Sequence, residues 1–194
     1  MQSYTMKQLA NQCRYHLYLD KGLHPAQRIH TVIDAGAHTG EFAQQFLDAE
    51  RIECYEPNAR LLPALHTQLR HHDNYTVHHT ALSNRKGTGT LTDLEDPGLN
   101  YMEYSQGTTS ITTLDAYGFD AVDLIKIDVE GAEFEVIQGA ERTIRRNRPV
   151  ICVETNHLSQ RYGHSKAEMI AVMQELGYKR VWKDWPNQIY VPAD

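Results

Sequence analysis

The chain has 194 residues, which is enough for one ordinary domain with a sizeable core. Its formal net charge is -6, and its lysines and arginines do not gather into a long basic stripe, so nucleic acid is not the expected partner. The sequence shows no signal peptide and no apolar run long enough to span a membrane, and its three cysteines lack metal-ligand spacing. We therefore expect a cytoplasmic protein without a membrane partner.

The N-terminal half of the chain alternates between strand and helix patterns. Short apolar runs predict strands over residues 28–35, 51–55 and 75–82. Apolar residues at helical spacing predict helices over residues 41–49 and 61–69, the second with Pro63 in its first turn. Residues 1–28 ahead of these elements are a polar, helix-prone lead-in, and residues 29–194 are expected to form one domain.

The middle of the chain is less regular. Residues 87–94 and 109–114 are β-like, and a polar loop over residues 95–108 separates them. Long loops without structure of their own are often functional. Because this loop carries Tyr101, Met102 and Tyr104, we interpret it as a lid or as a wall of an acceptor site.

Strand and helix patterns return toward the C-terminus. Buried strands are predicted over residues 122–129 and 149–154, with a helix between them on which Phe134, Ile137, Ala140 and Ile144 share one face. Ser165 and Glu168 form a capping box for a further helix, which Gly177 ends. Residues 178–183 and 188–191 are expected to close the chain as a hairpin. The alternation predicts an α/β fold with a mostly parallel sheet and a C-terminal antiparallel hairpin.

Three carboxylates follow the buried strand that ends at Val129. Asp128, Glu130 and Glu133 would lie at the carboxyl end of the strand, where open α/β sheets bind ligands. Glu133 falls in the first turn of the next helix, where the helix dipole favours negative charge, and we interpret it as a structural residue. Asp128 precedes any helix and is the functional candidate, with Glu130 second.

A glycine loop follows the first predicted strand. Gly36 permits a tight turn after Asp34, and Gly40 permits a close approach of backbone to a strand or a ligand. The loop lacks the third glycine of the dinucleotide fingerprint, and Asp34 would favour a cationic ligand over an anionic diphosphate. Glu56 ends the second strand about 20 residues further on, where a Rossmann-like fold places a carboxylate on ribose hydroxyls.

These segments resemble the FkbM-type methyltransferases. The resemblance rests on five motifs: Asp34 to Gly40, Glu56-Pro57, Ala81-Leu82-Ser83, Thr113-Leu114-Asp115 and, as the most specific, Ile125 to Glu133. It covers roughly residues 31–157. It implies a Rossmann-like, seven-stranded methyltransferase fold and an enzyme that depends on S-adenosylmethionine.

The resemblance also implies roles for individual residues. The methionine part of the cofactor would be surrounded by Gly36, Ala37, His38 and Gly40. Glu56 would hold the ribose hydroxyls, Ala81 and Leu82 would flank the adenine, and Asp128 would lie beside the amino group or the methyl-transfer centre. The sequence departs from the family at His38, where members usually carry Asn.

Transfer of the methyl group to a hydroxyl oxygen of a small molecule, a sugar or a natural product is the expected reaction. A hydroxyl is a poor nucleophile until its proton leaves, so a base or a metal would help. Asp128, Glu154 and His157 are the catalytic candidates, with His157 as the base suited to neutral pH and Glu154 orienting it. A divalent cation held by Glu154 and Asp128 through oxygen ligands stays open.

Other classes of function also stay open. The eleven histidines show no pair at helical spacing, so no histidine metal site is expected. A nicotinamide-dependent oxidoreductase could use a similar loop and ribose carboxylate, although the loop lacks its third glycine. A non-catalytic cofactor-binding module would keep the same fold without the chemistry.

Overall fold

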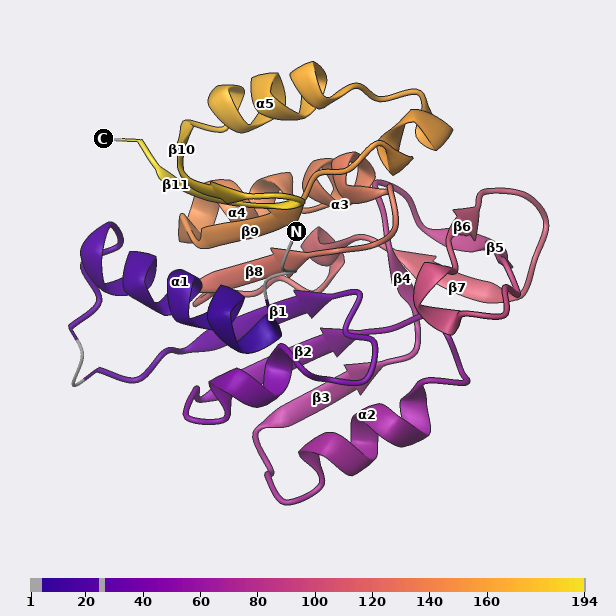
Figure 1. Cartoon of the computed structure of the whole chain (residues 1–194), viewed down its shortest axis with the longest axis horizontal. Coiled ribbons are helices and arrows are strands. Elements are labelled where there is room, and N and C mark those ends of the chain that lie inside the picture. The colour runs from indigo at the N-terminus through magenta and orange to yellow at the C-terminus, as the bar shows by residue number, and fades with distance from the viewer. Residues whose placement is uncertain (1–4, 25–26, 194) are drawn as a thin grey trace.

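A seven-stranded sheet forms the centre of the computed structural model, which describes residues 5–24 and 27–193 (Figure 1). The strand order is β10-β11-β9-β8-β1-β2-β3. The strands are β1 (Thr31–Ala35), β2 (Arg51–Tyr55), β3 (Tyr75–His78), β8 (Leu124–Ile127), β9 (Val150–Glu154), β10 (Tyr178–Asp184) and β11 (Asn187–Pro192). Strands β3, β2, β1, β8 and β9 are parallel, and β11 is antiparallel to both β9 and β10. The predicted Rossmann-like architecture with a closing hairpin is confirmed.

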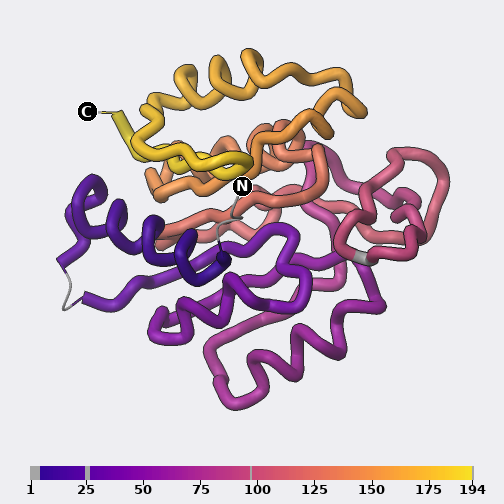
Figure 2. The backbone as a smooth tube through the Cα atoms, in the orientation of Figure 1, coloured from indigo at the N-terminus to yellow at the C-terminus, as the bar shows by residue number. Residues whose placement is uncertain are grey.

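Helices cover both faces of this sheet (Figures 1 and 2). One face packs against α1 (Met6–Leu19), the 3-10 helix η1 (Ala43–Phe46) and α2 (Leu62–Leu69). The other packs against α3 (Glu133–Gly139), α4 (Glu141–Asn147) and α5 (Lys166–Glu175). Successive strand residues point to opposite faces, so Val32 joins the first core and Ile33 the second. Double-sided burial explains the nearly continuous apolar runs of the inner strands.

A small second sheet lies beyond the carboxyl ends of the parallel strands, at the right of Figure 1. Its order is β4-β7-β5-β6. Its strands are β4 (Ala81–Leu82), β5 (Gly87–Leu91), β6 (Met102–Glu103) and β7 (Thr109–Thr112), and the 3-10 helices η2 (Pro97–Leu99) and η3 (Leu114–Ala116) adjoin it. The fold therefore places a separate wall over the edge at which the parallel strands end.

Two sequence predictions of secondary structure were wrong. The strand predicted over residues 75–82 divides into β3 and β4, which belong to different sheets, because the chain turns where the Thr80 N–H donates to His78 O at 2.9 Å. The helix predicted over residues 41–49 is only the short 3-10 helix η1. Its tighter turns are visible in the hydrogen bond from Gln45 N to Phe42 O, three residues back.

The predicted helix boundaries are better supported. Pro63 lies in the first turn of α2, and Ser165 and Glu168 form both hydrogen bonds of the capping box that begins α5. Gly177 follows α5 with a φ of 76°. The helix predicted after Asp128 divides into α3 and α4 at Ala140. Among the described residues, no helix has the length and apolar character that a membrane crossing requires.

Candidate active site

A cavity of about 370 Å³ opens at the carboxyl ends of β1, β2 and β8. This is the edge at which open α/β sheets bind their ligands, and the volume is in the range of small-molecule sites. The loops after these strands form its floor, and segment 96–102 next to the small sheet forms a wall. Met6, at the start of α1, also lines it. No sequence signal connected Met6 with the ligand edge.

Gly36 allows the ends of β1 and β8 to approach each other. Its φ is 77°, and a Cβ atom there would lie 1.8 Å from the Asp128 carbonyl oxygen. Gly36, Ala37 and His38, the residues predicted to surround the methionine part of the cofactor, line the cavity. Gly40 does not; it packs toward α2, where a Cβ atom would lie 2.7 Å from Leu65 Cδ1. The structure therefore places Gly40 against α2 and outside the cavity lining.

The conformation of His38 accounts for its departure from the family pattern. Its φ of 51° is left-handed, a region in which Asn and His are both enriched relative to other non-glycine residues. The exchange therefore preserves the backbone of the loop. The imidazole ring lies against Gly98 of the opposite wall, where a Cβ atom would come within 3.1 Å of Nε2. His38 thus connects the glycine loop with the loop predicted to be a lid.

Glu56 is held in place by backbone groups at the end of β2. Its Oε2 accepts the N–H of His38 and its Oε1 accepts the N–H of Asn58, each at 2.8 Å. Burial raises the pKa of this carboxyl, and the two hydrogen bonds act in the opposite direction. Glu56 lines the cavity, as do Ala81 and Leu82 of β4. The three residues predicted to contact the nucleoside therefore lie in one cavity.

Asp34 does not face the cavity, contrary to the prediction that it would meet a cationic ligand. It is fully buried, and its nearest cation is Lys126, whose Nζ lies 3.1 Å from Oδ1. The two residues are register partners on β1 and β8, so their side chains leave the sheet together. Burial raises the pKa of Asp34, and the Lys126 charge opposes that rise. Asp34 thus neutralises a buried lysine and does not line the cavity.

Lys126 is a cavity-lining residue that the sequence predictions missed. Burial lowers the pKa of its ammonium group, but Asp34 and Asp128 raise it by more, so the group stays charged. Its Nζ donates to Gly36 O at 2.6 Å and lies 3.6 Å from Asp128 Oδ2. A signal existed, because a lysine in a strand buried on both faces requires a counter-charge.

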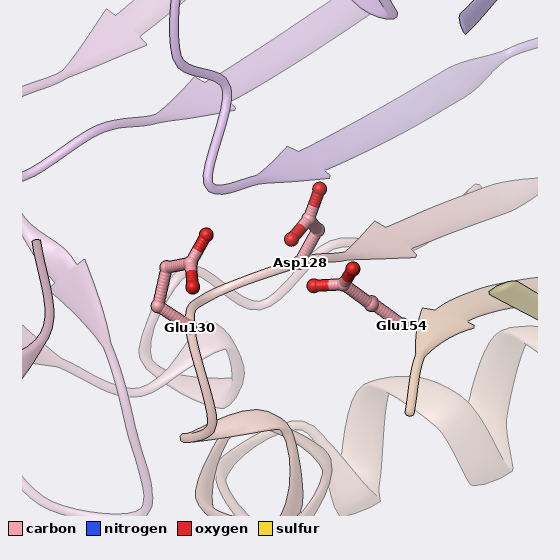
Figure 3. A group of neighbouring side chains, drawn as sticks. All are labelled: Asp128, Glu130 and Glu154. Atoms are coloured by element: carbon pink, nitrogen blue, oxygen red, sulfur yellow. The ribbon is translucent and has the colours of Figure 1, made fainter. Parts of the chain in front are cut away.

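Asp128, Glu130 and Glu154 form an acidic cluster (Figure 3), and the first two line the cavity. One carboxylate oxygen of each lies within 4.8 Å of the others. The parallel pairing of Ile127 with Val153 brings the ends of β8 and β9 together. The predicted proximity of Asp128 and Glu154 is therefore confirmed.

Mutual repulsion and burial change the protonation of this cluster. Burial and the nearby Asp128 raise the pKa of Glu154 to about 9 and that of Glu130 to about 7. Glu130 also has a left-handed φ of 57°, an uncommon backbone conformation for glutamate. The cluster can therefore exchange protons near neutral pH, or it can bind a cation that offsets the repulsion.

Glu133 is structural, as predicted. It is the first residue of α3 and is buried, and its Oε1 accepts the N–H groups of Val129 and Gly131 at 3.1 and 3.0 Å. These bonds fix the turn that carries Glu130. Burial raises the pKa of Glu133 to about 7, and the backbone donors oppose the rise.

His157 does not reach the cavity. It is exposed and caps the 3-10 helix η4 (Leu158–Tyr162), and it is absent from the cavity lining. Asn156 instead turns back, with Nδ2 donating to Glu154 Oε2 at 3.2 Å while Oδ1 accepts the Leu158 N–H at 2.7 Å. The geometry therefore does not support His157 as the base. Glu154 was predicted to orient His157, but its hydrogen-bond partner is the neighbouring Asn156, and nothing in the sequence distinguished these two residues.

The loop predicted over residues 95–108 forms the wall opposite the glycine loop. Asp96, Gly98, Leu99, Asn100, Tyr101 and Met102 line the cavity. Tyr104 packs elsewhere, with the Ser83 hydroxyl donating to its OH at 2.9 Å. The wall is anchored to η4, because the Tyr162 OH donates to Met102 O at 2.7 Å and the Arg161 guanidinium lies 4.1 Å from the centre of the Tyr101 ring.

The fold and cavity define a Rossmann-like protein with a ligand site at the carboxyl ends of its parallel strands. The sequence model of the methyltransferase FkbM domain matches residues 34–180. The chain belongs to this family. The matched residues include the glycine loop, the acidic cluster and segment 96–102, which forms the wall of the cavity.

Individual relatives agree with this assignment. The chain is 26% identical over 145 residues to the 2-O-methyltransferase NoeI of Sinorhizobium fredii, an alignment that covers 60% of each protein. The crystal structure of methyltransferase FkbM from Methylobacillus flagellatus KT superposes with a TM-score of 0.66 at 20% identity, over 91% of this chain and 47% of that one. The chain thus spans between about half and 60% of these two relatives.

More distant solved structures share the fold alone. The magnesium protoporphyrin IX methyltransferase ChlM from Synechocystis, solved with bound SAM, has a TM-score of 0.56 at 11% identity, over 96% of this chain and 79% of that one. An rRNA methylase from Streptococcus thermophilus has a TM-score of 0.57 at 9% identity, over 87% and 89% of the two chains. The fold therefore does not select the methyl acceptor.

Proposed function

We propose that this chain transfers a methyl group from S-adenosylmethionine to a hydroxyl oxygen of a small molecule, such as a sugar or a natural product. The observation that carries the proposal is the position of Glu56, which two backbone N–H groups aim at the cavity, with the glycine loop beside it. Family membership and the name of the 2-O-methyltransferase relative support the reaction type.

The cavity suits each part of this cofactor. Each Glu56 oxygen keeps a lone pair beyond its backbone donor, so the carboxylate can accept both ribose hydroxyls. Ala81 and Leu82 provide an apolar surface for the adenine. The turn formed by Gly36, Ala37 and His38 would surround the methionine end. Asp128 and Glu130 line the same cavity, and their charge attracts the sulfonium and the ammonium of the cofactor.

Methyl transfer then requires an acceptor oxygen in line with the bond from sulfur to the methyl carbon. The oxygen forms a bond to the methyl carbon, the electron pair of the broken bond returns to sulfur, and the hydroxyl proton leaves. Alignment of the two reactants supplies much of the rate enhancement, on the order of 7–11 kcal/mol in well-oriented systems. The acidic cluster takes the proton, since Asp128 and Glu130 line the cavity and Glu130 has a pKa near neutrality.

A divalent cation in the acidic cluster is a separate part of the proposal. Three carboxylates provide the oxygen ligands that Mg²⁺ and Ca²⁺ prefer, and their spacing allows one ion to reach all three. Such an ion would offset the repulsion that raises the pKa of Glu154 and Glu130. Asp128, Glu130 and Glu154 would hold it, and it would lower the pKa of a bound hydroxyl.

The ligand is tested by calorimetry with S-adenosylmethionine and with NAD. We expect the first to bind and the second not to, because the cavity places acidic side chains where a diphosphate would lie. Glu56→Gln should weaken S-adenosylmethionine binding at least tenfold, since it removes charge and one acceptor from the ribose site. Glu50→Gln, an exposed position just ahead of β2, is the matched control and should bind as the wild type does. Binding of NAD alone would overturn the proposal in favour of an oxidoreductase.

The acceptor is tested by turnover against hydroxylated sugars and, in parallel, against RNA. The net charge of -6 and the acidic edge of the cavity favour the small molecules. Methylation of RNA with no turnover of the sugars would contradict the acceptor class and leave the cofactor assignment intact.

A further inference from the structure

Lys126 places a positive charge within an otherwise apolar layer. It is 4% exposed and follows Leu124 by two positions, on the face that packs under α1 and η1. Across the sheet, one row of register partners reads Cys54, Asp34, Lys126 and Cys152. Replacing a buried ion pair by apolar residues of similar volume is often neutral or stabilising. A buried ion pair is therefore weak evidence for a role in stability, and the contacts of Lys126 at the ligand edge point to a role there.

The ammonium group contacts both loops that form the floor of the cavity. It donates to the Gly36 carbonyl after β1 at 2.6 Å, and it lies 3.6 Å from the Asp128 carboxylate after β8. Asp34, on the neighbouring strand β1, supplies the counter-charge, with Oδ1 3.1 Å from the Lys126 Nζ. One cation thus joins the turn predicted to hold the methionine end of the cofactor to the carboxylate predicted to lie beside it.

Backbone hydrogen bonds hold the N–H groups of the Gly36 turn to β2, and the Asp128 N–H donates to Ala35 O just before the turn at 3.1 Å. The N–H groups of Gly36 and Ala37 donate to Tyr55 O of β2 at 3.0 and 3.1 Å. The Gly36 carbonyl points the other way, toward β8, and Lys126 fixes it there. A neutral side chain at position 126 would leave the N–H side of the peptide after Gly36 bonded to Tyr55 O and remove the bond to its carbonyl oxygen.

We propose that Lys126 is a positioning residue for the methionine end of the cofactor, acting through the Gly36 carbonyl and the Asp128 carboxylate. This inference rests on the proposed function. It predicts a division within the site: the methionine end depends on Lys126, whereas the nucleoside end depends on Glu56, Ala81 and Leu82.

The test compares S-adenosylmethionine with 5′-methylthioadenosine, which has the nucleoside and sulfur but lacks the amino-acid end. Lys126→Met alone would leave Asp34 as an unpaired buried charge, so it is made in an Asp34→Asn background. Asp34→Asn alone keeps the Lys126 contacts and should bind both ligands within about threefold of the wild type. Adding Lys126→Met should weaken S-adenosylmethionine at least tenfold and leave methylthioadenosine unchanged. Lys86→Met, at an exposed position, is the control for loss of a lysine.

Each other result has a defined meaning. Wild-type affinity of the double variant for S-adenosylmethionine, or an equal loss for both ligands, overturns the positioning role. Failure of the double variant to fold, where Asp34→Asn folds, also overturns it, because Lys126 would then be a structural residue. If the wild type binds neither ligand, the proposed function itself fails, which is a distinct outcome.

Discussion

Two residues of the cavity have backbone conformations that few side chains tolerate. Among the described residues, the non-glycine positions with positive φ are His38, Glu130 and Arg148. Arg148 ends helix α4, which is a common place for this conformation, but His38 and Glu130 both line the cavity. Backbone strain of this kind persists where the surrounding structure imposes it, and it concentrates at functional sites. The contacts of Glu56 with His38 and of Glu133 with the turn after Val129 provide that constraint.

At the residue scale, Gly36→Ala should damage the cofactor site more than backbone strain alone would. A left-handed alanine costs about 1–2 kcal/mol, and the new Cβ would also meet Asp128 O at 1.8 Å. Gly118→Ala is the matched control, because Gly118 has a similar φ of 67° with nothing within 4 Å of an added Cβ. Thermal melts and calorimetry should show cofactor binding lost only in Gly36→Ala. Equal effects of the two substitutions would mean that the close approach of β1 and β8 is unimportant.

At the scale of elements, sequence periodicity located the parallel strands and the capped helices. It succeeded there because burial on both faces and capping residues leave local signatures. It failed at residues 75–82, because an apolar run does not reveal a turn that transfers the chain to a second sheet. It also failed at residues 41–49, where tertiary packing of Phe42 and Phe46 accompanies a 3-10 turn in place of a full helix.

The side chains at the ligand edge show the same limit. Asp128 and Glu154 could be predicted as neighbours, since parallel strands end at a common edge. That Asn156 and not His157 contacts Glu154 could not be predicted. Which of two adjacent residues turns back toward the strand depends on the course of the loop that follows it. Lys126 required a partner, but sequence alone did not pair it with Asp34.

The wall formed by segment 96–102 depends on η4 for its position. The Tyr162 OH donates to Met102 O, a bond worth about 1 kcal/mol. Tyr162→Phe should therefore accelerate amide hydrogen exchange in the wall while exchange in β8 stays unchanged. Tyr178→Phe is the control. It also removes a hydrogen bond from a tyrosine OH to a backbone carbonyl, that of Pro149 at 2.9 Å, and both residues are far from the wall in the sequence. Unchanged exchange in Tyr162→Phe would show that η4 does not anchor the wall.

For the whole molecule, the acidic cluster connects the site to global stability. The pKa of Glu154 is about 9 and those of Glu130 and Glu133 are about 7, all above the unfolded value near 4.5. Between these values the native state binds more protons than the unfolded state, so the free energy of unfolding falls as pH rises. The stabilisation is complete below about pH 4.5 and is lost as pH rises through 7 to 9. The burial that raises these pKa values thus lowers stability under alkaline conditions.

Melting temperatures measured in a chelator should therefore be lower by several degrees or more at pH 8.5 than at pH 6. Glu154→Gln should reduce this dependence, because it removes the carboxyl with the highest pKa in the cluster. Glu175→Gln, at an exposed position at the end of α5, should leave it unchanged. Added Mg²⁺ should recover the loss at pH 8.5 in the wild type and not in Glu154→Gln if the cluster binds the ion. A melting temperature that stays constant over this range in the chelator would show that Glu154, Glu130 and Glu133 do not have raised pKa values in the native state.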